Sequence, residues 1–436
     1  MLNFIKKHTW VLILVLVLIL VPQSLNIQSE LNMRTLITGV AVDKDGEQFE
    51  VTAQIVKPKV GGSSPSGNAE LDFVSVKAKT ISEALNKIAY LLGKTAGLSH
   101  INFILVGKDL ACSDEMQGTL DYFLRNTKII SSALVIIAPN KAKDELNKTL
   151  GLETTNAVGL QKLYAYKENS MNGVAKKLQE FVNDAYTKSK SSIVSGFSIQ
   201  KEGEGTTGAT TGGASTGDDS SGGVSADSQS GGEGSGGGSD GGSNSGSGSG
   251  NKARISYDNP LYLFSNNQLK TVLTDVDELL GIYLLSGAAS DGVVSVENVN
   301  SEFFENAKLG LSLRNKKVKY KAFIDDAGIK NLGITLSVGK TEITEIDSKN
   351  ISLSLFESDR TYLSDSVKNA ISKKFTEAIS KAINKAHESG VDILDIADRL
   401  YRRYGKKFGD WLDSNQDFEW LKSVKITLNV QIKNIE

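Results

Sequence analysis

Three short motifs in the chain have the residue types of catalytic or nucleotide-binding sites. Gly237–Gly241 reads G-x-S-x-G, the pattern that surrounds a nucleophilic serine. Such a serine needs a strand before it and a helix after it, and neither flank has that character. Gly93–Thr95 and Gly339–Thr341 resemble the end of a P-loop, but both lack the glycine five residues earlier. The motifs therefore predict neither a hydrolase nor a nucleotide site.

Titratable residues that could act in pairs have simpler structural interpretations. Asp392 and Asp395 are expected on nearby turns of one helix, where Asp392 would cap the N-terminus. Asp121 and Arg125 are one helical turn apart and are expected to form an ion pair. The single Cys112 and the three histidines of the chain argue against a disulfide framework and a Cys/His metal centre. We predict no enzyme, no catalytic residue, no cofactor and no metal.

The charge balance argues against nucleic acid as a partner. The 436 residues carry a formal net charge of −2, and 23% of them are charged. Glu202–Gly250 contains seven acids and no Lys or Arg, so the remainder carries +5. This value is small for a body of that size. The composition also assigns no small-molecule substrate.

The N-terminus has the pattern of a membrane-targeting segment. Lys6 and Lys7 precede an apolar run, Trp10–Val21, which ends at Pro22. Twelve apolar residues match the core of a signal peptide and fall short of the roughly 20 of a comfortable span. The basic residues predict a cytoplasmic N-terminus and an extracytoplasmic body. Because no small-x-small cleavage site follows, an uncleaved signal anchor is favoured over a cleaved signal peptide.

The stretch from Ser99 to Pro139 predicts a strand–helix–strand unit around which the N-terminal domain is built. Ile101–Val106 and Ser132–Ala138 are short apolar runs rich in Ile and Val, as buried strands are. Met116, Leu120 and Phe123 recur at helical spacing between them. His100 is expected at a buried strand edge, with a structural role.

Other segments of the chain also show clear periodicity. Thr80–Leu92 is an amphipathic helix with a capping pair, Thr80 and Glu83. Val293–Leu355 alternates apolar and polar residues as an antiparallel sheet with one wet face does. Tyr362–Glu388 is a long helix, and Val424–Ile432 is a final strand. Further strands are expected at 35–42, 48–57 and 71–78, and further helices at 141–150, 156–167, 174–188 and 275–285.

The segment Glu202–Gly250 predicts a disordered insert, since 19 of its 49 residues are Gly. The flanking segments Ser192–Gln200 and Arg254–Phe264 have strand character. We expect them to be neighbouring strands, with the insert at the tip of their hairpin.

The order of motifs along the chain resembles the Ger(x)C family, the C subunits of nutrient germinant receptors in endospore-forming bacteria. The resemblance runs from about Glu30 to the end, excluding the insert. It is carried by these residues: Thr38–Asp43, His100–Asn102, Gly107–Ala111, Leu120–Arg125, Leu134–Ala138, Asp392, Tyr401, Arg402 and Trp420. The chain departs from the family pattern at Leu25 (a lipobox Cys in the family), Asn126 (Asp), His387 (Gln) and after Ile435 (a closing Gly).

Together these patterns predict a multi-domain α+β protein with mixed and antiparallel sheets and packed helices, preceded by a membrane anchor. The expected divisions are an anchor or signal peptide at 1–24, an N-terminal domain at 30–150, a middle domain at 151–290 interrupted by an insert at 202–252, and a C-terminal domain at 291–436.

The resemblance implies a membrane-anchored, extracytoplasmic receptor subunit that binds integral membrane subunits, both transporter-like and multi-span. Its location would then be the spore inner membrane. The alternative is a free-standing envelope binding protein with a related fold, which the missing lipobox and the insert favour. For either function, we expect a partner-binding surface near the C-terminal helices at Arg399, Tyr401, Arg402, Arg403 and Trp411. A solvated helix face is the other interpretation of this cluster.

Overall fold

The computed structural model describes residues 34–57, 70–147, 156–169, 171, 173–196, 199–200, 254–255, 260–287, 289–347 and 363–433. The expected anchor at 1–24 and the insert at 202–252 lie outside these residues. No helix in the described ranges has the length and apolarity needed to cross a membrane.

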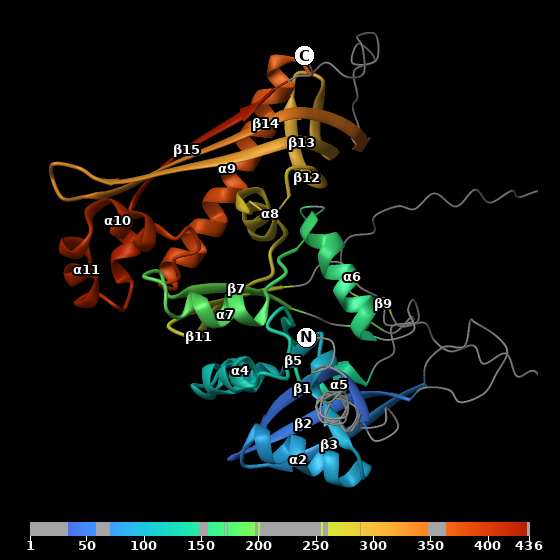
Figure 1. The fold of residues 1–436 in the computed structure, drawn as a ribbon. Helices are drawn as coiled ribbons and strands as arrows, with labels where there is room; N and C mark the ends of the chain where they lie inside the picture. The colour runs from blue at the N-terminus through green and yellow to red at the C-terminus, as the bar shows by residue number, and fades with distance from the viewer. Residues whose placement is uncertain are drawn as a thin grey trace, which may run out of the picture.

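A mixed sheet organises the N-terminal part of the molecule, at the bottom of Figure 1. Its strand order is β3-β2-β1-β5-β6, and the short β4 also pairs with β1. β1, β2 and β3 are antiparallel, whereas β5 and β6 run parallel to β1. The strands are β1 (Arg34–Asp45), β2 (Gln48–Lys57), β3 (Glu70–Ala78), β4 (Thr95–Gly97), β5 (Phe103–Val106) and β6 (Leu134–Ile137). The parallel neighbours β5 and β6 confirm the predicted strand–helix–strand unit.

The helices of this part are α2 (Ile81–Leu92), η2 (Leu98–His100), α3 (Lys108–Ala111), α4 (Glu115–Arg125), α5 (Ala142–Leu146) and α6 (Asn156–Asn169). α2 begins as predicted, because the Thr80 hydroxyl accepts a hydrogen bond from the N–H of Glu83 at 3.2 Å. It ends at Gly93, which has a φ of 60°. Leu85 and Ile88 face the sheet and are buried in its core.

A three-stranded sheet of order β11-β10-β7 lies between the N-terminal and C-terminal parts. Its elements are β7 (Ser191–Ser195), β10 (Leu261–Ser265) and β11 (Gln268–Leu273), with α7 (Leu178–Asp184) and α8 (Val276–Leu285) beside it. Side chains alternate between the two faces of β10. Tyr262 and Phe264 pack into the N-terminal core, whereas Leu261 and Leu263 pack against α8 and the long helix α9 (Asp365–Glu388). The sheet therefore joins the two halves through apolar contacts on both faces.

The strands that flank the insert are neighbours, as predicted. β7 pairs antiparallel with β10, so that Ser195 lies opposite Leu261. Farther out, β8 (Ile199–Gln200) pairs antiparallel with β9 (Arg254–Ile255). The two ends of the segment 201–253 are therefore held together by a hairpin stem.

The C-terminal part is a second mixed sheet, of order β12-β13-β14-β15, covered on one face by α9 (Figure 1). Its strands are β12 (Gly292–Ser301), β13 (Phe304–Ile324), β14 (Lys330–Asp347) and β15 (Lys425–Ile432). The first three strands are antiparallel, and β15 pairs parallel with β14. Ile371, Phe375 and Ile379 of α9 are fully buried against this sheet. Three short helical segments complete the part: α10 (Ile396–Tyr404), α11 (Lys406–Asp413) and η4 (Glu419–Ser423).

Three predicted helices have different bounds in the structure. The helix expected at 141–150 is only α5, which ends at Leu146. The helix expected at 174–188 is only α7, because residues 185–190 leave it to contact α10 and α11. The helix that was expected to carry Asp392 and Asp395 begins only at Ile396, so these two residues are not on nearby turns of one helix. Asp395 has a φ of 52° and lies immediately before the helix.

Candidate partner-binding surface

Asp392 fixes the start of α10. Its carboxylate accepts hydrogen bonds from the backbone N–H groups of Ile396 and Ala397, both at 2.8 Å. The residue is buried, and burial raises the pKa of its carboxyl to about 6, although these hydrogen bonds oppose the shift. Asp392 therefore acts as the cap that was predicted, from a position before the helix rather than inside it.

Arg399 and Arg403 attach α10 to the hairpin formed by β13 and β14. The guanidinium of Arg399 lies 4.2 Å from the ring centroid of Tyr320, and its Nε donates to the carbonyl of Leu394 at 2.9 Å. Arg403 Nη1 donates to the carbonyl of Ala322 at 3.1 Å. These two arginines have structural partners within the protein and are less available to another chain.

Arg402, in contrast, is exposed and makes no hydrogen bond or ion pair with any residue that the structure describes. Tyr401 precedes it and is 37% exposed. The Nζ atom of Lys188 lies 4.9 Å from the Tyr401 ring centroid. Of the five residues in the predicted surface, Arg402 and Tyr401 are thus the ones that α10 presents to solvent without a strong internal bond.

Trp411 and Trp420 belong to one aromatic cluster with Phe408 and Phe418. Trp411 is half-buried and stacks on Phe408 with ring centroids 5.4 Å apart, and Trp420 is buried at 5.7 Å from Trp411. The Nζ atom of Lys330, at the start of β14, lies 3.8 Å from the Trp411 centroid. The cluster therefore joins α11 and η4 to the end of the hairpin. Trp411 is mainly part of this packing.

His100 and Arg125 lie in the N-terminal part and are not brought to α10. His100 ends η2 and is exposed, so the expectation of a buried strand edge is wrong. The chain enters β5 only at Phe103, three residues later. Arg125 Nε donates to Asp121 Oδ2 at 2.5 Å, which is the expected ion pair on the exposed face of α4.

A loop far away in sequence completes the surroundings of α10, and sequence reasoning missed it. The Asp398 carboxylate accepts hydrogen bonds from the backbone N–H groups of Lys188 and Ser189, both at 3.2 Å. Lys190 Nζ donates to Gln416 Oε1 at 3.2 Å. A cavity of about 280 Å³ lies between residues 185–190 and the segment from Leu412 to Phe418. No local pattern signals contacts between residues about two hundred positions apart.

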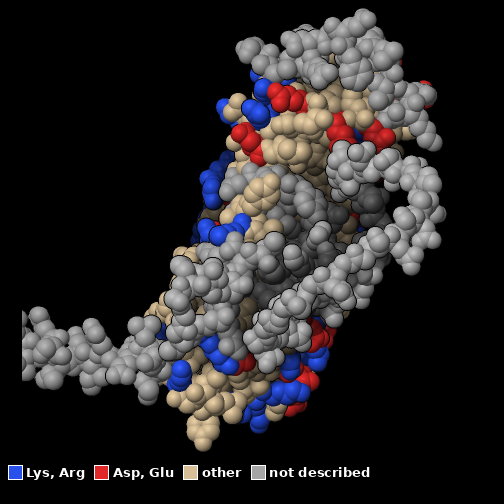
Figure 2. All heavy atoms as spheres, turned by 90° about the vertical axis from the view of Figure 1, so that its right-hand side faces the viewer, with Lys and Arg blue, Asp and Glu red and all other residues tan. Residues whose placement is uncertain are grey.

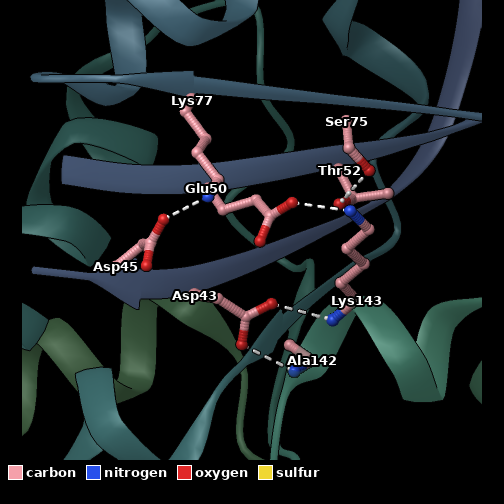
Figure 3. A network of polar contacts seen from close by, with 8 residues as sticks. All are labelled: Asp43, Asp45, Glu50, Thr52, Ser75, Lys77, Ala142 and Lys143. Carbon is pink, nitrogen blue, oxygen red and sulfur yellow. Dashed lines mark hydrogen bonds and ion pairs between the residues drawn. The ribbon is translucent and has the colours of Figure 1, made fainter.

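Asp43, the last residue of the motif Thr38–Asp43, belongs to a structural network that is seen in Figure 3. The Asp43 carboxylate points at the first turn of α5 and accepts from the N–H groups of Ala142 and Lys143 at 2.7 and 2.9 Å. Lys143 Nζ in turn contacts Glu50 Oε1 at 2.6 Å. Gly107 leaves room for this arrangement, because a Cβ atom there would lie 2.0 Å from Asp43 Oδ1. These contacts attach α5 to β1 and β2.

Titratable side chains with shifted pKa values lie in both halves of the described structure. No group of three His, Cys, Asp or Glu side chains in these ranges could hold a metal ion. Two carboxyl groups with raised pKa values, Asp43 and Asp392, accept hydrogen bonds from backbone N–H groups of nearby helices.

Comparison with known proteins places the chain. The family model described as the spore germination protein N-terminal domain matches residues 28–199, and the model described as spore germination B3/GerAC like, C-terminal matches residues 261–436. Together the two models cover most of the chain, in the expected order.

The chain belongs to the Ger(x)C family of spore germination proteins.

Two curated spore germination proteins are similar to this Ger(x)C protein over part of their length. The chain is 28% identical over 142 residues to YfkR of Bacillus subtilis (strain 168), a protein named for spore germination, and 27% identical over 111 residues to spore germination protein B3 of the same organism. The matched segments are 31% and 25% of this chain, and 37% and 29% of those proteins. These segments thus span about a third of the curated relatives.

A solved structure supports the fold of this Ger(x)C protein. The crystal structure of the GerBC protein superposes with a TM-score of 0.50 over 91% of this chain and 97% of that chain, at 15% identity. The mixed α+β architecture that was predicted is therefore shared with GerBC.

Proposed function

We propose that the protein is a membrane-anchored, extracytoplasmic subunit of a nutrient germinant receptor, which acts by binding integral membrane subunits. The observation that carries the proposal is the ordered match of both spore germination models along the chain. The apolar run Trp10–Val21 after Lys6 and Lys7 supports the anchor and its orientation. Anchoring raises the effective concentration of a weak contact, so the interface with the membrane subunits can be small.

Arg402 and Tyr401 form the centre of the proposed docking surface. Both are exposed on α10, and the side chain of Arg402 has no internal hydrogen bond or ion pair within the described ranges. Arg399, Arg403 and Trp411 hold the surface in place through their contacts with the β13–β14 hairpin. The domain divisions given by the sequence remain a prediction.

The substitution Arg402→Glu tests this surface. Because Arg402 has no internal partner to lose, the melting temperature should not change. Co-purification of the membrane subunits should fall by about tenfold or more, since a reversed charge repels its former partner. Lys128→Glu is the matched control, because Lys128 is exposed and makes no ion pair in the described part of the chain. Equal co-purification of both variants would argue against docking through α10.

The receptor function itself is tested by deleting the gene. One nutrient-triggered germination response should be lost, while sporulation and nutrient-independent germination persist. Re-expression of the intact protein should restore the response. If every nutrient response survives the deletion, the receptor proposal is wrong.

The second candidate is a free-standing envelope binding protein. Leu25 occupies the position at which the Ger(x)C family has its lipid-modified cysteine. This departure favours the second candidate. It predicts that the protein purifies without integral membrane subunits even when crosslinked in intact membranes.

A further inference from the structure

One face of the C-terminal sheet carries a row of unpaired lysines. α9 covers the inner face, and side chains with the opposite orientation point outward from β13, β14 and β15. The outward lysines are all exposed, and they are Lys317, Lys319, Lys321 and Lys425, followed by Lys433 directly after β15. We call these five residues the lysine face.

Strand register defines the positions of the lysines relative to one another. Lys317, Lys319 and Lys321 lie opposite Ser337, Thr335 and Gly333 of β14. Those residues lie opposite Gln431, Asn429 and Thr427 of β15. Adjacent strands are about 4.8 Å apart and alternate residues about 7 Å apart. Lys317, Lys319 and Lys321 therefore follow one another along β13, and Lys425 and Lys433 stand at the two ends of β15, two strands away.

The strand positions between the lysines carry no acid. The outward positions of β14 and β15 between the lysines are Asn, Gly, Ser, Thr and Gln. None of the five lysines has an ion pair with a residue that the structure describes. Two acids lie at the tip of the hairpin. Asp325 accepts hydrogen bonds from Ile329, Ala327 and Asn331, and these bonds together with the charge of Lys425 lower the pKa of its carboxyl. Asp326 beside it is exposed. Figure 2 shows Lys and Arg side chains along the left edge of the upper part of the molecule, with Asp and Glu side chains among them near the top.

We propose that the lysine face docks on an anionic lipid surface. Complementary charge is the main argument, because lysines held near a membrane attract acidic headgroups additively. The chemistry of the cations supports a lipid surface, since an ammonium group binds phosphate without the directional, bidentate geometry of arginine. The face is an extended sheet with polar side chains between the cations. Aromatic stacking residues of a single-stranded nucleic-acid site are not exposed on it; Phe323 is half-buried beneath Lys321.

This inference is independent of the receptor proposal and of the surface around Arg402. α10 packs on the inner side of the hairpin, where the Arg399 guanidinium meets Tyr320. Tyr320 alternates with Lys319 and Lys321, which point to the other side. The protein could thus bind lipid through one side of the hairpin and a protein partner through the other.

The experiment uses the full chain in nanodiscs of phosphatidylcholine with or without phosphatidylglycerol. A donor fluorophore is attached at Asn429→Cys in a Cys112→Ser background, and an acceptor is placed on the lipid headgroups. Cys112 is the single cysteine and is exposed, so its replacement leaves one labelling site. Energy transfer should rise with phosphatidylglycerol and fall again in 0.5 M salt, because salt screens the attraction.

Two matched triple variants test whether the lysine face is responsible for docking on anionic nanodiscs. Lys317→Gln with Lys319→Gln and Lys321→Gln should lower the ratio of docked to free molecules about a hundredfold, at about fivefold for each lysine. The control changes three exposed, unpaired lysines of the N-terminal part, Lys94, Lys108 and Lys128, to Gln and should retain docking. Thermal melting of both variants checks the fold. The proposal is wrong if energy transfer is equal on neutral and anionic nanodiscs, or if both triple variants lose docking to the same extent. Tighter binding to a 30-nucleotide RNA than to anionic nanodiscs would assign the face to nucleic acid instead.

Discussion

His387 and Asp392 are two buried titratable residues near the start of α10, and their pKa values are shifted in opposite directions. Burial lowers the pKa of His387 to about 4, opposed by a hydrogen bond with the Leu421 backbone. Burial raises the pKa of Asp392 to about 6. The Nε2 atom of His387 has no hydrogen-bond partner in the described part of the chain, in keeping with a neutral ring.

These shifts predict two opposite pH dependences of stability. At pH values between about 4 and the ordinary histidine pKa of 6.5, His387 binds more protons in the unfolded chain than in the folded protein. Its contribution to the free energy of unfolding is therefore present above pH 6.5 and is lost as the pH falls toward 4. Asp392 binds more protons in the folded protein between pH 3.8 and about 6, so its contribution is present below pH 3.8 and is lost as pH rises through 6. Each contribution amounts to about 3 kcal/mol at most.

Single substitutions separate the two residues. His387→Gln introduces the residue that is common at this position in the Ger(x)C family. The free energy of unfolding of this variant should rise less between pH 4 and 6 than that of the parent protein. Asp392→Asn should make it rise more steeply, although its absolute stability falls because a cap is weakened. Urea denaturation at several pH values measures both slopes. Parallel profiles for the two variants and the parent would contradict the shifted pKa values.

At the scale of elements, two glycines allow close contacts of β1 with its neighbours β5 and α5. Gly39 makes room for the ring of Phe103, since a Cβ atom at position 39 would lie 2.2 Å from that ring. Gly107 does the same for the carboxylate of Asp43, which holds the first turn of α5. These contacts join β1 to β5 and to α5. The family motifs in this region are therefore explained by packing.

The substitution Gly107→Ala should displace the Asp43 carboxylate and weaken its two hydrogen bonds to α5. Loss of buried, charge-assisted hydrogen bonds predicts a decrease of about 2–3 kcal/mol in the free energy of unfolding. Gly118→Ala is the matched control, because Gly118 is exposed on α4 and a Cβ atom there meets nothing within 4 Å. The control should gain about 0.5–1 kcal/mol from helix propensity. If chemical denaturation shows a similar small gain in the free energy of unfolding for both variants, the role of Gly107 in positioning the Asp43 carboxylate is wrong.

At the scale of the whole molecule, the proposed orientation depends on the N-terminal segment. Lys6 and Lys7 would remain in the cytoplasm while the two halves and their joining sheet stand outside. The lysine face and the surface around Arg402 lie on opposite sides of the β13–β14 hairpin. One elongated body could therefore contact lipid and protein at once.

The anchor predicts the mature N-terminus. Mass spectrometry of membrane-extracted protein should find the peptide Met1–Val21 retained and Leu25 unmodified. Deletion of Lys6–Val21 should abolish membrane association that resists carbonate, because the apolar run is then missing. Deletion of residues 202–250 serves as a control that leaves this association intact. A mature N-terminus anywhere from Ser24 to Glu30 would disprove the uncleaved anchor.

The sequence alone determined the family, the mixed α+β class and many of the elements. Strong periodicity and caps made this possible, as for α2 with Thr80 and for the strand–helix–strand unit around α4. Family motifs occur in order along the chain and need no tertiary information. The stem around the insert was also predictable, because both of its arms have strand character.

Only the tertiary structure decided which charged residues are available at the surface. Arg402 and Arg403 are adjacent in sequence, but only Arg403 reaches the carbonyl of Ala322 on the hairpin. The lysine face needs the pairing of β14 with β15, whose residues are about a hundred positions apart. The contacts of residues 185–190 with α10 span more than two hundred positions. Local sequence periodicity predicts which side chains share a face of one helix or strand. Which residues of distant segments contact each other depends on how those segments pack in the folded protein.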